Sequence, residues 1–229
     1  MATTVAGLPL LSRMAGAQGG RSPVAGINLG VQTYSFHDIM IDGRDHSPDI
    51  IAKMKACGLF TCEIFAAQLE PNTWPGILPP ADICPTPFHG CLPKDGDITK
   101  SPWTYNLRNP WAWKFAKLPE PELSAKRARQ KQWRETVDLG YFREIRRRFD
   151  AAGIDVYAYN PYFAVDATDL EIERSFEMAK ALGCKAVGLS TTHTLLKRTI
   201  PFAEKHGIVA AAHNHSITWN PEEFGTRDS

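Results

Sequence analysis

Two histidines near the C-terminal end of the sequence have the spacing of a ligand pair. His213 and His215 flank Asn214 and directly follow the apolar run 208–212. On a continuing strand, residues i and i+2 point to the same side of the sheet, so both imidazoles would face one site. Neutral imidazole is a common metal ligand, and a neighbouring amide fixes its tautomer. The pattern predicts either part of a metal site or a hydrogen-bonded histidine pair without metal.

Other polar side chains follow apolar runs in the same way. A single strand-end carboxylate such as Glu63 is more often solvated or ion-paired than functional. The indication comes from recurrence, because the carboxyl ends of parallel strands carry the chemistry of α/β proteins. The set expected to converge comprises Gln32, Tyr34, Glu63, Tyr159, Asn160, Thr191, Thr192, His213 and His215.

These residues are positioned by a unit that recurs along the chain. An amphipathic helical pattern ends at a glycine and is followed by a short apolar strand, with strands expected at 27–34, 59–65, 154–160, 184–190 and 208–213. The terminating glycines, expected in the left-handed conformation, are Gly58, Gly153, Gly183 and Gly207. Ser47 and Thr168 are expected as N-caps, and Glu171 completes a capping box with Thr168.

Strands that alternate with helices predict an α/β fold with a parallel sheet, either a (β/α) barrel or a doubly wound sheet. No GxGxxG follows the first strand, which weakens the nucleotide-binding alternative. The barrel is favoured, although a complete barrel has eight strands and about 250 residues. We therefore expect a TIM-barrel type truncated after about five βα units.

A long segment after the second expected strand breaks the pattern. Residues 68–133 hold eleven of the seventeen prolines and five of the six tryptophans. Proline fixes φ and removes a hydrogen-bond donor, so we expect a long irregular insertion rather than a helical layer. It is interpreted either as a lid that contacts substrate or as a covering or oligomer contact.

Composition and charge give no indication of a nucleic-acid-binding or membrane-spanning protein. The net charge is +1, without a long run of one sign, so no nucleic-acid footprint is expected. The sequence contains no run of 18 apolar residues, so no membrane span is predicted. Residues 1–26 are expected to lie outside the fold, as a leader or as the remnant of an export signal. The expected localisation is cytoplasmic, or periplasmic if that signal began upstream.

Four segments and the histidine pair resemble the sugar phosphate isomerase/epimerase family, whose members have a xylose isomerase-like TIM barrel. The resemblance covers about residues 28–67 and 140–216. It rests on LGVQTYSF (29–36), MKACGLFTCEI (54–64), AKALGCKAV (179–187), PFAEKHGI (201–208) and the HNH triplet (213–215). It implies a divalent cation, Mn, Mg or Zn, and a sugar or related polyol whose proton moves next to a carbonyl.

Carried onto this chain, the resemblance makes Glu63 and His215 catalytic and places His213 at the metal, where relatives have a glutamate. Tyr34, Asn160 and Asn214 are expected to bind substrate. The ligands that relatives take from strands six to eight have no counterpart before Ser229, so a domain spanning 27–229 would be a partial barrel.

Two functions are therefore expected. The first is a metal-dependent isomerase or epimerase of a sugar or polyol, inactive alone if strands six to eight are missing. The second is a non-catalytic sugar-binding or assembly subunit that a partner chain completes. In both cases a homo- or hetero-oligomer would cover the open barrel.

Overall fold

The computed structural model of the chain describes residues 27, 29–36, 38–39, 43–70, 120–163 and 166–214. Their strands are β1 (Gly30–Gln32), β2 (Thr61–Phe65), β3 (Asp155–Asn160), β4 (Ala186–Leu189) and β5 (Val209–Ala212). Their helices are α1 (Ser47–Cys57), α3 (Glu120–Thr136), α4 (Gly140–Ala151), α5 (Asp169–Ala181) and α6 (His193–His206). Short 3-10 turns follow the first two strands, η1 at Thr33–Ser35 and η2 at Ala66–Gln68.

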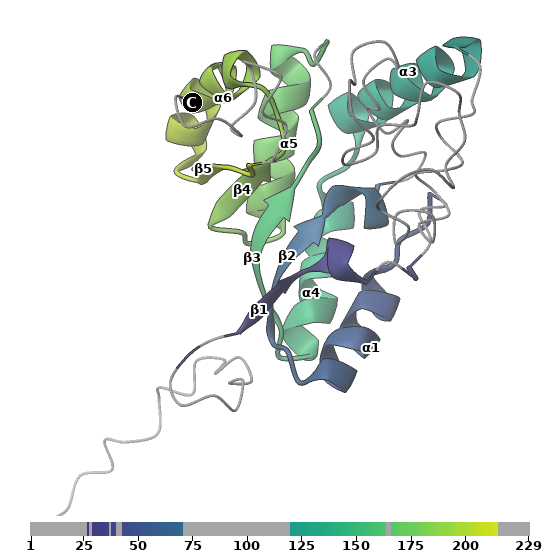
Figure 1. Cartoon of the computed structure of the whole chain (residues 1–229), viewed down its shortest axis with the longest axis vertical. Coiled ribbons are helices and arrows are strands. Elements are labelled where there is room, and N and C mark those ends of the chain that lie inside the picture. The colour runs from purple at the N-terminus through teal and green to yellow at the C-terminus, as the bar shows by residue number, and fades with distance from the viewer. Residues whose placement is uncertain are drawn as a thin grey trace, which may run out of the picture.

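The five described strands form one parallel sheet in the order β1-β2-β3-β4-β5. Each strand therefore pairs with its neighbours along the chain (Figure 1). The α/β class and the parallel sheet expected from the sequence are confirmed.

A layer of helices covers the apolar side of this sheet. α4 packs on β3, α5 on β4 and α6 on β5, and α1, α4, α5 and α6 pack against one another in that order. Fully buried aliphatic and aromatic side chains fill the space between the layers, and burying apolar surface is the main favourable term in folding. The largest of them include Ile50, Met54, Ile64, Phe142, Ile145, Phe149, Ile172 and Phe176.

Glycines end the helices as the sequence predicts. Gly58, Gly153, Gly183 and Gly207 have φ values between 64 and 74°. A side chain is disfavoured in this left-handed region, which glycine tolerates. The N-cap of α1 is His46 rather than Ser47, a shift of one residue.

Helix α3 corrects the prediction of an irregular segment over 68–133. Residues 120–133 of that segment belong to a 17-residue helix, shown in the upper part of Figure 1 beside α5. Its sequence after Pro121 is rich in Ala, Lys, Arg, Gln and Glu, which are strong helix formers. Proline is tolerated in the first helical turn, so it does not break this helix. Residues 71–119 lie outside the described residues.

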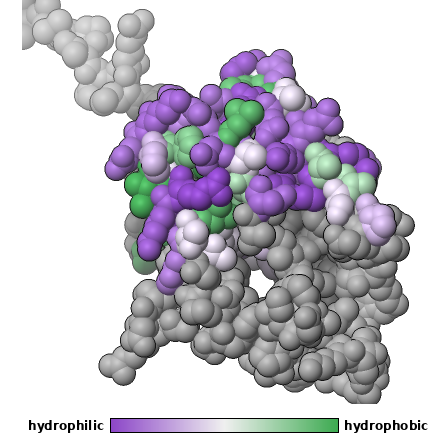
Figure 2. Space-filling view, turned by 90° about the horizontal axis from the view of Figure 1, so that it is seen from above, coloured by the Kyte–Doolittle hydropathy of each residue, from purple (hydrophilic) through white to green (hydrophobic). Residues whose placement is uncertain are grey.

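The arginine-rich stretch of α4 is neutralised by acidic neighbours. Arg146 pairs with Asp150 at 2.7 Å, and Arg148 pairs with Asp45 at 2.5 Å. Seen from above, the described surface is mainly hydrophilic, with a few separate hydrophobic residues (Figure 2). Among the described helices, none combines the length and the apolar character that a bilayer crossing needs.

Candidate functional site

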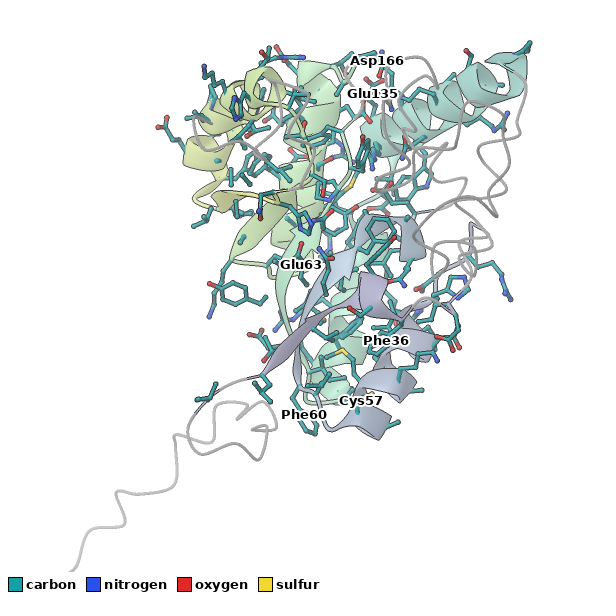
Figure 3. All side chains as sticks on the ribbon, viewed as in Figure 1. Phe36, Cys57, Phe60, Glu63, Glu135 and Asp166 are labelled. Atoms are coloured by element: carbon teal, nitrogen blue, oxygen red, sulfur yellow. The ribbon has the colours of Figure 1, made fainter. Side chains whose placement is uncertain are left out.

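The two strands beside β2 bring amide side chains to the Glu63 carboxyl group. Gln32 of β1 donates a hydrogen bond from Nε2 to Glu63 Oε1 at 3.0 Å. Asn160 of β3 donates from Nδ2 to the same oxygen at 2.8 Å. Glu63 is half-buried, whereas Asn160 is only 2% exposed. Figure 3 places Glu63 in the middle of the sheet, far from Glu135 of α3 and from Asp166, which precedes α5, both in the upper part of the view.

The second oxygen of this carboxyl group, Oε2, is available to a ligand. Within the described part of the chain, Oε2 of Glu63 accepts no hydrogen bond. A carboxylate offers about four acceptor positions on its two oxygens, so a ligand can still use half of this group. We call Gln32, Glu63 and Asn160 the carboxylate clamp.

A bulge in the sheet selects which residue of β3 joins the clamp. Cys62 pairs with Val156, but Glu63 pairs with Ala158, so the register shifts by one residue at Tyr157. A shift of one residue exchanges the two faces of a strand. Asn160 consequently shares a face with Glu63.

Tyr159 is directed to the opposite face, which corrects its expected place in the convergent set. The side chain is fully buried, its ring lies 6.0 Å from that of Phe142 on α4, and its hydroxyl donates to Glu70 Oε1 at 2.5 Å. Burial and the neighbouring Glu70 charge raise the pKa of Tyr159 well above its ordinary value. The tyrosine therefore belongs to the helix side of the sheet.

Tyr34 lies next to the clamp. It belongs to the turn η1 directly after β1, and its ring meets that of Phe65 edge to face, with 5.2 Å between the centroids. Phe65 in turn pairs with Asn160 across the β2–β3 ladder. Glu63 and Asn160 are thus hydrogen-bonded to each other, and Tyr34 contacts a side chain of the strand that carries Glu63.

The predicted β5 residues continue the sheet. The His213 amide donates to the Leu189 carbonyl at 2.9 Å, which extends the β4–β5 ladder beyond Ala212. His213 is half-buried and Asn214 is exposed, and His215 lies outside the described residues. The histidine pair therefore stays a prediction.

The structure describes only part of the donor set expected for a divalent ion, because His215 lies outside the described residues. Among the described residues, no group of three or more His, Cys, Asp or Glu side chains is placed to hold a metal ion. Structural and catalytic metal sites generally use at least three protein ligands. The described side chains do not fit such an ion, and we derive no chemistry through it.

A second polar cluster is buried at the carboxyl ends of β2 and β3. Arg134 of α3 contacts Glu70 Oε2 at 2.9 Å and Glu171 Oε1 at 3.0 Å, and donates to the Tyr162 carbonyl at 2.7 Å. Arg127 holds Glu171 from a second position, at 2.8 and 2.6 Å. We call Glu70, Arg127, Arg134 and Glu171 the ion-pair network.

Opposite charges keep this network ionised despite its burial. Burial opposes ionisation of Glu171, but hydrogen bonds from Arg127 and the Arg134 charge leave its pKa below the ordinary value. Burial likewise works against the Arg134 cation, and the charges of Glu70 and Glu171 outweigh it, raising the pKa of Arg134. With each charge paired, the network ties α3 to α5 and to the turn after β2, a structural role.

The same network revises the capping box predicted at the start of α5. The Thr168 hydroxyl accepts a hydrogen bond from the Glu171 amide at 3.1 Å, as predicted. The Glu171 side chain does not complete the box, because the two arginines bind it. Thr192, expected at the site, caps α6 by accepting from the Leu195 amide at 3.3 Å.

The three described cysteines are free thiols, and two of them, Cys62 and Cys184, are buried. Burial is the main cause that raises the pKa of Cys62 to about 12, and burial also raises the pKa of Cys184. The thiolate is the nucleophilic form, so neither residue is a nucleophile near neutral pH. Cys57 is exposed on α1.

No protein-family model matches the chain, and no curated protein matches it. The crystal structure of an uncharacterised protein from Parabacteroides distasonis aligns with a TM-score of 0.42 at 16% sequence identity. The alignment covers 85% of this chain and 55% of that chain, so the chain spans little more than half of that protein's length.

Proposed function

We propose that this protein is an isomerase or epimerase-type enzyme that moves a proton next to the carbonyl of a sugar or related polyol. The observation that carries the proposal is the carboxylate clamp. Two amide donors fix one oxygen of Glu63 on the sheet and leave Oε2 with no hydrogen bond among the described residues. A fixed carboxylate with one available oxygen suits a general base.

The proposed step conserves atoms and electrons. Glu63 Oε2 takes a proton from the carbon beside the carbonyl. The electron pair of the broken C–H bond forms the carbon–carbon double bond, and the carbonyl π pair moves onto its oxygen to give an enediolate. Return of the proton from Glu63 to the former carbonyl carbon, with transfer of the hydroxyl proton to the former carbonyl oxygen, gives an isomer. Protonation of the original carbon from the opposite face by a solvent proton, with the electron pair returning to the carbonyl, gives an epimer. The amides of Gln32 and Asn160 keep the carboxylate oriented throughout, and Tyr34 borders the same site.

Solvent deuterium exchange tests this proposal without knowledge of the natural substrate. A panel of aldoses and ketoses is incubated with the protein in D₂O, with Mn²⁺, Mg²⁺ or Zn²⁺ in separate samples, and loss of the proton beside the carbonyl is followed by NMR. Glu63→Gln removes the base with little change of shape and should slow exchange about 10²- to 10⁴-fold. Glu204→Gln makes the same change at an exposed position of α6 and should exchange like the wild type.

An unaltered exchange rate in Glu63→Gln would refute the assignment of Glu63. A wild-type protein that binds a sugar of the panel without exchanging its proton would favour the non-catalytic reading over the enzyme.

A separate observation supports the second candidate, an assembly subunit completed by a partner chain. β5 ends the described sheet, and three of its four residues are exposed: Val209, with 63% exposure, Ala211 and Ala212. Parallel sheets are normally covered on both faces. Sedimentation over a range of concentrations tests this candidate, and Val209→Lys should weaken any self-association. A monomer at every concentration and with every candidate partner would argue against it.

A further inference from the structure

A glycine in β4 leaves the space that the carboxylate clamp occupies. A Cβ atom added to Gly188 would lie less than 3.0 Å from Glu63 Oε1, closer than real Cβ atoms come to other heavy atoms. The same Cβ would lie 3.1 Å from Asn160 Nδ2. These two atoms are the acceptor and the donor of the 2.8 Å hydrogen bond between Glu63 and Asn160.

Backbone conformation does not require a glycine at this position. Gly188 is a regular residue of a strand that pairs on both sides, and its φ lies outside the left-handed region. Glycine in the interior of a strand costs stability and marks places where another group approaches closely. Here the approaching group is the clamp, because the nearest atoms come from Glu63 and Asn160.

We propose that Gly188 is a positioning residue. Because it has no side chain, the Glu63 carboxylate can lie with Oε1 hydrogen-bonded to Gln32 and Asn160, and Oε2 is then the oxygen that meets the ligand. The inference rests on the proposed function only for the role of Oε2. The positioning itself follows from the clamp and is measurable without a substrate.

A side chain at position 188 would displace the Glu63 carboxylate of the clamp rather than disturb the hydrophobic core. The atom in its way is the end of the flexible Glu63 side chain, so the carboxylate yields rather than the backbone. Rotation of that carboxylate breaks its hydrogen bonds with Gln32 and Asn160 together, since both donors share Oε1. One added methyl group therefore releases both amides.

Side-chain NMR of the full chain reports this release directly. The NH₂ signals of Gln32 and Asn160, assigned through their own side-chain carbons, are compared in wild type, Gly188→Ala and Gly30→Ala. The control adds the same methyl group to β1, where the three nearest atoms all belong to Thr61 and none to the clamp. We expect both NH₂ signals to move toward those of solvated amides in Gly188→Ala and to stay in place in Gly30→Ala. Unmoved signals in Gly188→Ala would overturn the proposal.

A double variant keeps the test decisive if Gly188→Ala does not fold. Glu63→Ala vacates the space, so Gly188→Ala should lower the melting temperature much less in the Glu63→Ala background than in wild type. An equal drop in both backgrounds would show that the added methyl group meets something else, and the proposal would fail.

The two proposals fail in different experiments. If Gly188→Ala releases the amides while Glu63→Gln retains deuterium exchange, the positioning stands and the proposed function falls. If both hold, Gly188→Ala should also slow exchange about 10²-fold, the usual effect of moving a catalytic group by about 1 Å.

Discussion

Replacing Arg134 by methionine should cost more stability than any other single removal of a charge from the described surface or core. Methionine retains an apolar stem of similar length but removes the guanidinium from a site where the arginine side chain is 1% exposed. Glu70 and Glu171, both fully buried, lose that cation, and the Tyr162 carbonyl loses its donor.

The magnitude follows from which partners remain. Glu171 keeps its two hydrogen bonds from Arg127, and Glu70 keeps the hydrogen bond from the Tyr159 hydroxyl, but Glu70 loses its buried ion pair with Arg134. Breaking a buried ion pair by removing one side costs about 3–5 kcal/mol. For a domain of this size that corresponds to a melting temperature about 6–20 °C lower.

Urea unfolding at pH 7 provides the assay, with Arg143→Met as the matched control. Arg143 is 59% exposed and lies 3.9 Å from Asp138, so its loss should change stability by at most about 1 kcal/mol. If Arg134→Met loses no more than this control, the network does not stabilise the fold and the reasoning is refuted.

The pH dependence of the unfolding free energy gives a second test of the network, because the direction of the change is set by the lowered pKa of Glu171. The pKa of Glu171 is lower in the folded protein than its ordinary value of 4.5. Its ionisation therefore stabilises the protein fully above pH 4.5, and this contribution is lost as the pH falls through the folded-state pKa. Protonation of Glu171 also removes a negative charge that Arg134 compensates. The difference in unfolding free energy between wild type and Arg134→Met should therefore become smaller in acid. A difference that widens in acid would contradict the assignment.

Three further predictions concern single residues. Gly183→Ala should destabilise more than Gly153→Ala in urea. Both positions have φ above 70°, but only the first would bring Cβ against the Arg146 guanidinium, at 2.7 Å from Nη1. The second should cost about 1–2 kcal/mol. Thr168→Ala should cost about 1 kcal/mol through loss of its cap, measured by thermal melting, and Thr168→Ser should restore it. Cys57 should react with a thiol reagent in the native protein and Cys62 only after unfolding, as mapped by peptide mass, because burial raises the pKa of the Cys62 thiol to about 12; equal native rates would count against that burial.

Local signals in the sequence were sufficient for most of the fold. Apolar periodicity located all five described strands, and the glycines that end α1 and α6 were recognisable because only glycine readily adopts their φ values. The same reasoning failed for α3, where the prolines that precede and begin the helix were taken as evidence against it.

The site was less predictable because its geometry depends on contacts between strands. Glu63 and Asn160 were expected to converge, but the bulge at Tyr157 decides that Asn160, and not Tyr159, faces the carboxylate. No pattern along β3 alone reveals that shift. Gly188 was passed over for the same reason, since its neighbour Glu63 is 125 positions away in the chain.

The sequential strand order also bears on how the protein is made. Each described strand pairs with the one synthesised just before it, so a ribosome-bound chain always emerges beside a finished edge. Domains fold from the N-terminus as synthesis proceeds, at about 5–20 residues per second. Strand β5 would then dock on a sheet already four strands wide, within seconds of leaving the exit tunnel. The architecture therefore suits vectorial folding, in which each described strand after β1 finds one pairing partner already synthesised.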